Sequence, residues 1–282
     1  MENFGNAKTV RNNNSSRFGK YLELFFTEDG EPAGGATEKF LLEKTRVAFQ
    51  AKNERNFHIF YALVAGADGW MRENFGLDGT PTQFKYLSGS GCYTVDGIDD
   101  KEEFRLVSEA FTAVGIDQQS QTHIWQLLSG ILHLGNIEFQ GDPQAVVHPD
   151  QFYQGELDWA AYCFEVDRSQ LEASITTQTI NVCGDFVTKQ QNADQSCGLR
   201  DALAKSLYER IFDFLISKLN AAMGGGGAGG GGGGEGGFAG GGNGGFRGPP
   251  GRGGFGGGGP PGRGGPPGRG GFPPARGGFP PA

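Results

Sequence analysis

The sequence predicts a mainly α-helical fold with a small β component, of mixed α/β class, in residues 1–223 and a disordered segment in residues 224–282. Three observations support this prediction. Apolar residues recur with helical spacing in four segments after residue 50, they alternate in one segment before residue 30, and the composition changes abruptly after Met223. Of the 52 glycines in the chain, 33 follow that methionine. Residues 1–223 are therefore expected to form one folded unit or part of one, and the rest to have no core.

The β component is expected near the N-terminus. Leu22, Leu24 and Phe26 alternate along the chain, which predicts a strand over residues 18–26, and apolar residues between them indicate that both of its faces are covered. A turn is predicted over residues 28–32, with a return strand that starts at Lys39. Together these segments predict a hairpin at the edge of a sheet.

Three helices are predicted in the middle of the chain. Each combines apolar residues at helical spacing with a glycine shortly after the last of them. The predicted helices cover residues 57–64, 99–114 and 124–132, with stops at Gly66, Gly115 and Gly135. Asn53 is expected to cap the first helix. Asp99 and Asp100 are expected to lie at the N-terminus of the second helix, where their negative charges interact favourably with its positive end.

The last helix is predicted over residues 199–219, where leucine or isoleucine occupies every fourth position. Charged residues such as Arg200 and Asp201 lie between these positions. The segment is therefore expected to be a long packed helix with the leucine stripe as its apolar face.

Membrane and secreted classes are excluded by the apolar pattern. The longest apolar run, residues 58–67, has about half of the ~20 residues that a membrane-spanning helix needs. Residues 1–8 lack the apolar stretch of a secretory signal, so a cytoplasmic chain without a transmembrane segment is expected. None of the histidines has metal-ligand spacing, and His58 and His133, inside apolar segments, are expected to be hydrogen-bonded structural residues.

A polar loop precedes the predicted strand and is the main candidate site. The run Asn12-Asn13-Asn14-Ser15-Ser16-Arg17 supplies side-chain amides, two hydroxyls and a guanidinium. Such groups can face phosphate and Mg²⁺, because charged donors bind phosphate oxygens and Mg²⁺ prefers oxygen ligands. By composition alone, a solvated polar turn explains the same residues.

The loop lies in a longer stretch, Asn6-Ala7-Lys8-Thr9-Val10-Arg11-Asn12-Asn13-Asn14-Ser15-Ser16-Arg17-Phe18-Gly19-Lys20, that closely resembles the switch I segment of the myosin motor domain. Further segments resemble the same family in the same order: residues 41–47, 54–61, 132–137 and 200–210. The resemblance covers residues 3–221 and is closest in character to the short-tailed, amoeboid class I myosins. It implies a fragment from the upper part of the motor's P-loop NTPase fold, and a family function of ATP-driven movement on actin filaments.

The resemblance also implies roles for four residues of the loop. Asn12 would contact the phosphates of ATP, and Ser16 would place its hydroxyl on Mg²⁺. Ser15 would lie beside the γ-phosphate and the attacking water, and Arg17 would pair with a switch II glutamate. Ser15 and Arg17 are thus the catalytic candidates, and Asn12, Ser15 and Ser16 the cofactor-binding candidates. Residues 175–200 correspond to a loop that touches actin in the family, with an ordinary surface loop as the alternative.

Two parts of the family pattern do not occur in the sequence. A P-loop has the pattern G-x-x-x-x-G-K-[ST], but Gly19-Lys20 has Asn14 in place of the first glycine and Tyr21 in place of the hydroxyl residue. Met223 leads into glycine where switch II would follow, and the light-chain-binding neck is not found. We therefore expect Arg17 to have no glutamate partner and the chain alone not to hydrolyse ATP at a motor-like rate. A partial gene product is the alternative.

Residues 224–282 are of low complexity and cationic. Pro-Pro-Gly-Arg-Gly-Gly occurs at residues 249–254, 260–265 and 266–271. Five arginines and one acidic residue give this segment a charge of +4. Because the whole chain has a net charge of −8, residues 1–223 carry −12. Arginine and phenylalanine spaced by glycine suit RNA, anionic lipid or the acidic surface of an actin filament, while a flexible spacer is the alternative. The second hypothesis is therefore a non-enzymatic tether that binds actin or RNA through this tail.

Overall fold

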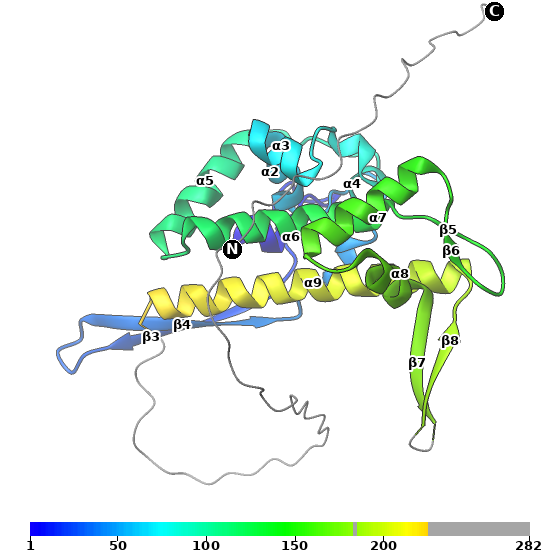
Figure 1. Cartoon of the computed structure of the whole chain (residues 1–282). Helices are drawn as coiled ribbons and strands as arrows, with labels where there is room; N and C mark the ends of the chain where they lie inside the picture. Colours follow the sequence, from blue (N-terminus) through cyan, green and yellow to red (C-terminus); the bar gives the residue numbers. More distant parts are fainter. Residues whose placement is uncertain (183–184, 225–282) are drawn as a thin grey trace, which may run out of the picture. The chain divides into compact units, whose positions relative to one another are not determined.

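A computed structural model describes residues 1–182 and 185–224 (Figure 1). Helices dominate, and each sheet in this part of the chain is an antiparallel pair of strands, so the predicted mixed fold is confirmed. The helices are α1 (Glu2–Gly5), α2 (His58–Gly66), α3 (Gly69–Phe75), α4 (Lys85–Ser88), α5 (Asp100–Ala113), α6 (Gln118–Asn136), α7 (Gln151–Phe164), α8 (Arg168–Thr176) and α9 (Ala193–Ala222), with 3₁₀ turns η1 (Lys44–Val47) and η2 (Pro81–Gln83). The strands are β1 (Asn6–Ala7), β2 (Ser15–Ser16), β3 (Gly19–Phe26), β4 (Pro32–Phe40), β5 (Phe139–Gln140), β6 (Val146–Val147), β7 (Thr177–Val182) and β8 (Asp185–Gln190). The predicted disordered segment, apart from Gly224, lies outside the described residues, and its boundary stays a prediction.

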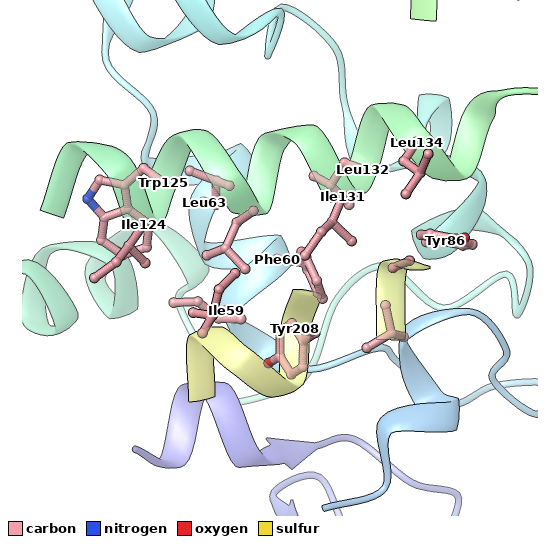
Figure 2. Packing of buried hydrophobic residues seen from close by; sticks show 14 of the residues in the cluster. Ile59, Phe60, Leu63, Tyr86, Ile124, Trp125, Ile131, Leu132, Leu134 and Tyr208 are labelled. Atoms are coloured by element: carbon pink, nitrogen blue, oxygen red, sulfur yellow. The ribbon is translucent and has the colours of Figure 1, made fainter. Parts of the chain in front are cut away.

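The core forms where α2, α6 and α9 meet (Figure 2). The Tyr208 ring of α9 stacks on Phe57 and Phe60, with ring centroids 4.9 and 5.2 Å away. Its hydroxyl donates to the Phe4 carbonyl at 2.7 Å, which satisfies the one polar atom of this buried ring. Trp125 and its neighbours on α6 close the cluster from the other side. The core thereby fixes the N-terminal segment, which leads into the candidate loop, to α9.

The long last helix is confirmed, and the predicted stripe is its buried face only in part, since Ile211 and Leu215 are buried and the other four stripe positions are half-buried. In the N-terminal half of α9, the buried positions recur every fourth residue from Ser196 through Arg200, Ala204 and Tyr208, one position after the half-buried leucines. Arg200 enters this face because its Nη1 donates to the Ile137 carbonyl at 2.7 Å and its other nitrogens bind Asp201. A one-residue shift rotates a helix face by about 100°, so in this half of the helix the buried face includes a charged residue with buried partners and leaves the leucines at its edge.

The predicted hairpin is confirmed, whereas its predicted cover is wrong. β3 pairs with β4 from Gly19 opposite Phe40 to Phe26 opposite Pro32, so the return strand starts at Pro32 rather than at Lys39. Along β3 only Phe25 is even half-buried. Within the described residues the hairpin packs mainly on the C-terminal part of α9, where Asn220 binds both backbone groups of Thr37 (Figure 1). Apolar residues on both strand faces therefore remain open to solvent in this part of the chain.

The predicted helix ends are partly confirmed. Asp99 caps α5 by accepting hydrogen bonds from the Lys101 and Glu102 amides, and Gly115 follows the helix with a φ of 78°. The prediction for Asn53 is wrong, because this residue has a φ of 66° in the preceding turn and α2 starts only at His58, without a side-chain cap. The third predicted helix is longer than expected, since α6 begins after the N-cap Asp117 and ends at Asn136.

The sequence predicted a loop over residues 175–200, and this prediction is wrong. They form the end of α8, the hairpin β7–β8 and the start of α9, whose capping box joins Asn192 and Gln195. Figure 1 shows β7 and β8 projecting from the region where α9 begins. The prediction missed this hairpin because its two strands are mostly polar and exposed, so they lack the regular apolar alternation that marks a half-buried strand.

The two buried histidines differ from each other. His133 is a hydrogen-bonded structural residue, as predicted, with Nδ1 2.6 Å from Glu156 and Nε2 2.8 Å from the Phe75 carbonyl. The prediction is wrong for His58, because neither ring nitrogen has a partner among the described residues. Burial and the nearby Arg55 charge lower the pKa of His58 to about 4. In the described part of the chain, no helix combines the length and apolar character needed to cross a membrane.

Candidate functional site

The candidate loop is closed by a short pair of strands. Asn6 pairs with Ser16 and Ala7 with Ser15, so β1 and β2 bring the two ends of residues 8–14 together. Inside the loop, the Thr9 amide donates to the Asn12 carbonyl at 2.8 Å, and the Thr9 hydroxyl accepts from the Asn12 amide at 3.1 Å. These local hydrogen bonds are the reason that a run of asparagines and serines forms an ordered turn.

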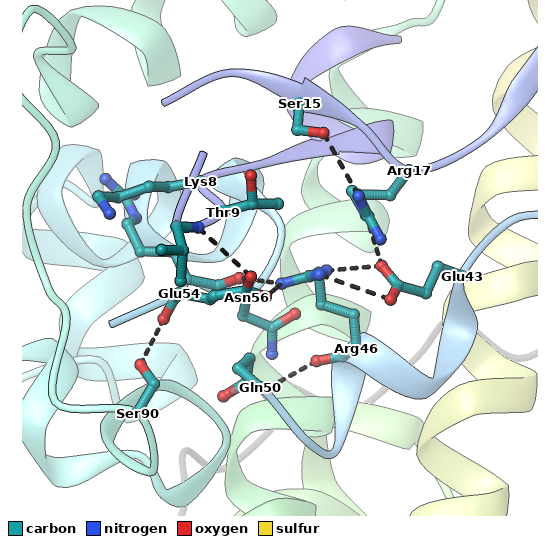
Figure 3. Close-up of polar contacts among 12 residues, drawn as sticks. Lys8, Thr9, Ser15, Arg17, Glu43, Arg46, Gln50, Glu54, Asn56 and Ser90 are labelled. Carbon is teal, nitrogen blue, oxygen red and sulfur yellow. Dashed lines mark hydrogen bonds and ion pairs between the residues drawn. The ribbon is translucent and has the colours of Figure 1, made fainter. Parts of the chain in front are cut away.

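Ser15 and Arg17 are brought together. The Ser15 hydroxyl accepts a hydrogen bond from Arg17 Nη1 at 3.3 Å (Figure 3). Asn12 and Ser16 are exposed and bind neighbours instead. Asn12 Oδ1 accepts from the Asn14 amide at 2.9 Å, and the Ser16 hydroxyl donates to the Phe18 carbonyl at 2.9 Å. The four predicted residues thus share one loop, but among them only Ser15 and Arg17 are joined by a side-chain hydrogen bond.

Arg17 has a carboxylate partner within this chain, contrary to the prediction. Its Nε donates to Glu43 Oε2 at 2.6 Å. The β3–β4 register explains the contact, because strands that pair Gly19 with Phe40 bring Arg17, two residues before β3, near Glu43, three residues after β4. The Glu43 amide in turn donates to the Arg17 carbonyl at 2.9 Å, which continues the pairing beyond the strands.

The electrostatic effect of this pair is visible on both partners. The hydrogen bond that Arg17 donates to Glu43 raises the pKa of the Arg17 guanidinium. Partial burial opposes ionisation of Glu43, but hydrogen bonds from Arg17 and Arg46 outweigh it, so the pKa of Glu43 lies below its ordinary value. Both groups are therefore charged at neutral pH.

The loop is suited to an anion. Residues 6–17 contain Lys8, Arg11 and Arg17 and no acidic residue. Exposed amides and hydroxyls at Asn12, Asn13 and Ser16 lie between these charges. Phosphate oxygens prefer such a mixture of cationic and neutral donors, and the Ser16 oxygen keeps lone pairs for a hard cation while its proton is donated to Phe18. The residues therefore fit one wall of a phosphate and Mg²⁺ site.

Sequence reasoning missed Glu43, Arg46 and Glu54 as parts of this site. All three lie in segments that had been noted only for their resemblance to the family. The signal that could have found Glu43 is the turn at residues 28–32, because a hairpin centred there places positions 17 and 43 side by side. No comparable sequence signal points to Glu54, which reaches the Val10 amide across a turn at 3.3 Å.

Comparison with known proteins decides the family. The model of the myosin head (motor domain) matches residues 1–227. The chain belongs to the myosin head family. The predicted resemblance of the chain to the myosin motor domain is therefore confirmed, and residues 1–227 are part of such a domain.

The myosin relatives include several from amoebae. The chain is 50% identical to the Myosin-K heavy chain of Dictyostelium discoideum over 226 residues, which are 79% of this chain and 26% of that protein. It is 43% identical to the Myosin ID heavy chain of the same organism over 231 residues, covering 79% of this chain and 21% of the relative. It is 44% identical to the Myosin heavy chain IB of Acanthamoeba castellanii over 225 residues, which cover 79% of this chain and 19% of that protein. The class I character predicted from the sequence is confirmed, and the chain spans about a quarter or less of these myosins.

Proposed function

We propose that this chain contributes the switch I wall of the nucleotide site in an actin-based, ATP-driven motor. The observation that carries the proposal is a cationic loop free of acidic residues, with Arg17 beside Ser15, in the part of a myosin head segment that resembles switch I. Members of the myosin family bind ATP and Mg²⁺. Participation of this loop in that binding is the proposal.

Each predicted residue has a role in it. Asn12 donates to the phosphates, Ser16 offers its hydroxyl oxygen to Mg²⁺, and Ser15 lies beside the γ-phosphate and the attacking water. Arg17 supplies positive charge next to Ser15. Mg²⁺, when bound, neutralises charge on the phosphate oxygens. Phosphoryl transfer needs positioning and charge stabilisation rather than covalent help from the protein, which suits a wall made of hydroxyls, amides and a guanidinium.

These 282 residues alone are proposed not to hydrolyse ATP at a motor-like rate. They contain no G-x-x-x-x-G-K-[ST] sequence, whose backbone amides would surround the phosphates. One wall leaves most of the phosphate charge in contact with water, where each hydrogen bond gains little over solvent. Catalysis by this loop is therefore proposed to require the phosphate-binding loop as well.

We propose that the β7–β8 hairpin takes part in filament contact. It corresponds to the segment that the sequence comparison associated with actin, and it exposes apolar side chains that a folded protein usually covers. Phe186 is 77% exposed and Val187 48% exposed. Exposed aromatic and aliphatic residues on a projecting hairpin are typical of a protein contact.

The alternative function, a tether that binds actin or RNA through the cationic tail, rests on residues 225–282, which lie outside the described residues. No comparison supports it or the predicted binding of anionic lipid. A cytoplasmic location on the actin cytoskeleton follows from the motor proposal.

A segment exchange tests the motor proposal. The ATP turnover of the unchanged Dictyostelium Myosin-K heavy chain is measured with and without actin filaments as the reference. Residues 1–221 of this chain then replace the matching segment of that heavy chain. The chimera is expected to keep filament-accelerated turnover. Changing Arg17→Ala in it should lower that turnover on the order of 10²- to 10³-fold, because a charged group near the reacting phosphate is lost.

The matched control is Arg105→Ala. Arg105 also binds carboxylates, those of Glu102 and Glu109, but it lies exposed on α5. Its loss is expected to leave turnover within about twofold, as for most surface substitutions. Equal effects of the two arginine substitutions, or full activity without Arg17, would refute the proposed role of the loop.

A further inference from the structure

Arg46 occupies the centre of a chain of charges behind the 8–17 loop (Figure 3). Its side chain is only 5% exposed. Nε donates to Glu43 Oε2 at 2.7 Å, while Nη1 donates to Glu54 Oε2 at 2.9 Å and to the Arg55 carbonyl at 3.0 Å. One buried guanidinium therefore joins two carboxylates that lie eleven positions apart in the sequence.

The two carboxylates hold opposite ends of the loop. Glu43 accepts from Arg17 Nε at the end of the loop. Glu54 accepts from the Val10 amide with its other oxygen, Oε1, near the start. Positive and negative groups alternate from Arg17 through Glu43 and Arg46 to Glu54, and we call these four residues the charge bridge.

Arg46 itself is fixed by its own element. It lies in η1, its carbonyl accepts from Gln50 Nε2 at 2.5 Å, and Nη1 is anchored on the Arg55 backbone. A guanidinium presents several donors in a rigid plane and can bind two carboxylates at once, whereas a lysine ammonium on a flexible stem cannot hold both directions. Without Arg46, Glu54 would lose its guanidinium partner while Glu43 kept only Arg17. The loss of the charge between these two partly buried carboxylates favours their separation.

We propose that Arg46 is a positioning residue, which sets the distance between the two ends of the 8–17 loop and transmits a change at one end to the other. The importance of Arg46 for catalysis rests on the proposed function of the loop, since the distance between the loop ends would decide how Arg17 and Ser15 face phosphate. The mechanical coupling through the charge bridge does not depend on nucleotide.

Nuclear magnetic resonance of the full 282-residue chain without nucleotide tests the coupling. The signal of the Arg17 Nε–H group is recorded in the unmodified chain, in Glu54→Gln, in Arg46→Met and in the double variant. Glu54→Gln is expected to move the Arg17 signal although the two residues share no hydrogen bond. In the Arg46→Met background the second substitution should add no further movement.

A second signal separates positioning from general stability. Exchange of the Val10 amide hydrogen is expected to become roughly tenfold faster in Arg46→Met, because its acceptor Glu54 loses its anchor. Amides in the middle of α6 should exchange as in the unmodified chain. A uniform acceleration of both sets would show that Arg46 serves the overall stability of the fold and would overturn the proposal.

The matched control is the exposed trio Glu102, Arg105 and Glu109, in which one arginine also joins two carboxylates. Glu102→Gln is expected to leave the Arg17 and Val10 signals unchanged. Two outcomes contradict the proposal. Glu54→Gln moves the Arg17 signal equally with and without Arg46, or it does not move the signal at all.

Arg46→Lys covers the case in which Arg46→Met does not fold. The charge is kept, so the chain should remain folded, but the link between Glu54 and the Arg17 signal should be lost. Full transmission through lysine would overturn the proposal. Failure of the motor function would instead appear as loss of turnover in the chimera, with these nucleotide-free signals intact.

Discussion

Glu43 accepts hydrogen bonds from Arg17 and Arg46 with the same carboxylate oxygen, at 2.6 and 2.7 Å. An arginine that the family resemblance assigns to a switch II glutamate is thus bound to a different acid in this structure. The two assignments are compatible, because an ion pair that is about one-third exposed contributes little to stability and can exchange partners at low cost. At the scale of single residues, the loop is therefore defined by its partners in other segments as much as by its own sequence.

His58 gives a pH prediction at the same scale. Its pKa is lowered to about 4 by burial and by Arg55, whereas in the unfolded chain it is near 6.5. Between these values the unfolded state binds the proton and the native state does not, so stability falls as the pH is lowered through 6.5. From pH 7 to pH 5 the free energy of unfolding should fall by about 2 kcal/mol more in the unmodified chain than in His58→Gln.

Urea unfolding at pH 7, 6 and 5 measures this difference. His123→Gln, which changes an exposed histidine, serves as the matched control. Parallel pH profiles of the unmodified chain and His58→Gln would contradict the proposed state of His58.

At the scale of elements, two helical glycines have opposite expected effects. A Cβ on Gly130 of α6 would lie 2.5 Å from Phe164 Cε1 and 2.9 Å from Cys163 Cβ, so this glycine lets α6 and α7 approach closely. On Gly155 of α7 a Cβ would meet nothing within 4 Å. We expect Gly130→Ala to destabilise the chain by about 1–3 kcal/mol through overpacking.

Gly155→Ala is the matched variant and should stabilise the chain by up to about 1 kcal/mol, since alanine favours a helix over glycine. Chemical unfolding of both variants measures the two changes. Equal effects of the same sign would show that the α6–α7 contact is looser than the structure indicates.

The elements also show how far the sequence predicts the fold. Helices with strong periodicity were predicted, and Asp99 was a reliable cap because its carboxylate faces two free amides. The buried face in the N-terminal half of α9 was missed, because Arg200 is buried by tertiary partners in α4 and in the segment after α6 that periodicity does not reveal. Hairpin β7–β8 and helices α3, α4, α7 and α8 were also missed, since they lack a clear apolar stripe or are short.

For the candidate site, the loop and all four of its residues could be named from the sequence, but not their partners. The contact between Arg17 and Glu43 depends on strand register, and the bridge from Glu43 to Glu54 depends on a buried arginine between them. These partners lie 26 or more positions from the loop's arginine, and only the turn at residues 28–32 gives a sequence signal for one of them, Glu43. The roles of Asn12, Ser15, Ser16 and Arg17 toward nucleotide remain predictions.

At the scale of the whole molecule, the described part of the chain has a well-packed core beside an open hairpin. Tyr21, Leu24 and Phe26 on β3 are each more than half exposed, an arrangement typical of a surface that binds another chain segment. The chain also matches only 26% of the Myosin-K heavy chain. The proposed wall of a nucleotide site, combined with an open apolar surface, is what we expect of a motor segment whose activity depends on further parts.

The most direct test of this account is the steady-state ATP turnover of the homogeneous 282-residue chain, measured with and without actin filaments. The account predicts no turnover above the level of an Arg17→Ala variant and no acceleration by filaments, because a single wall cannot surround the phosphates. Filament-accelerated turnover that disappears in Arg17→Ala would contradict it, since these residues would then hold a complete site.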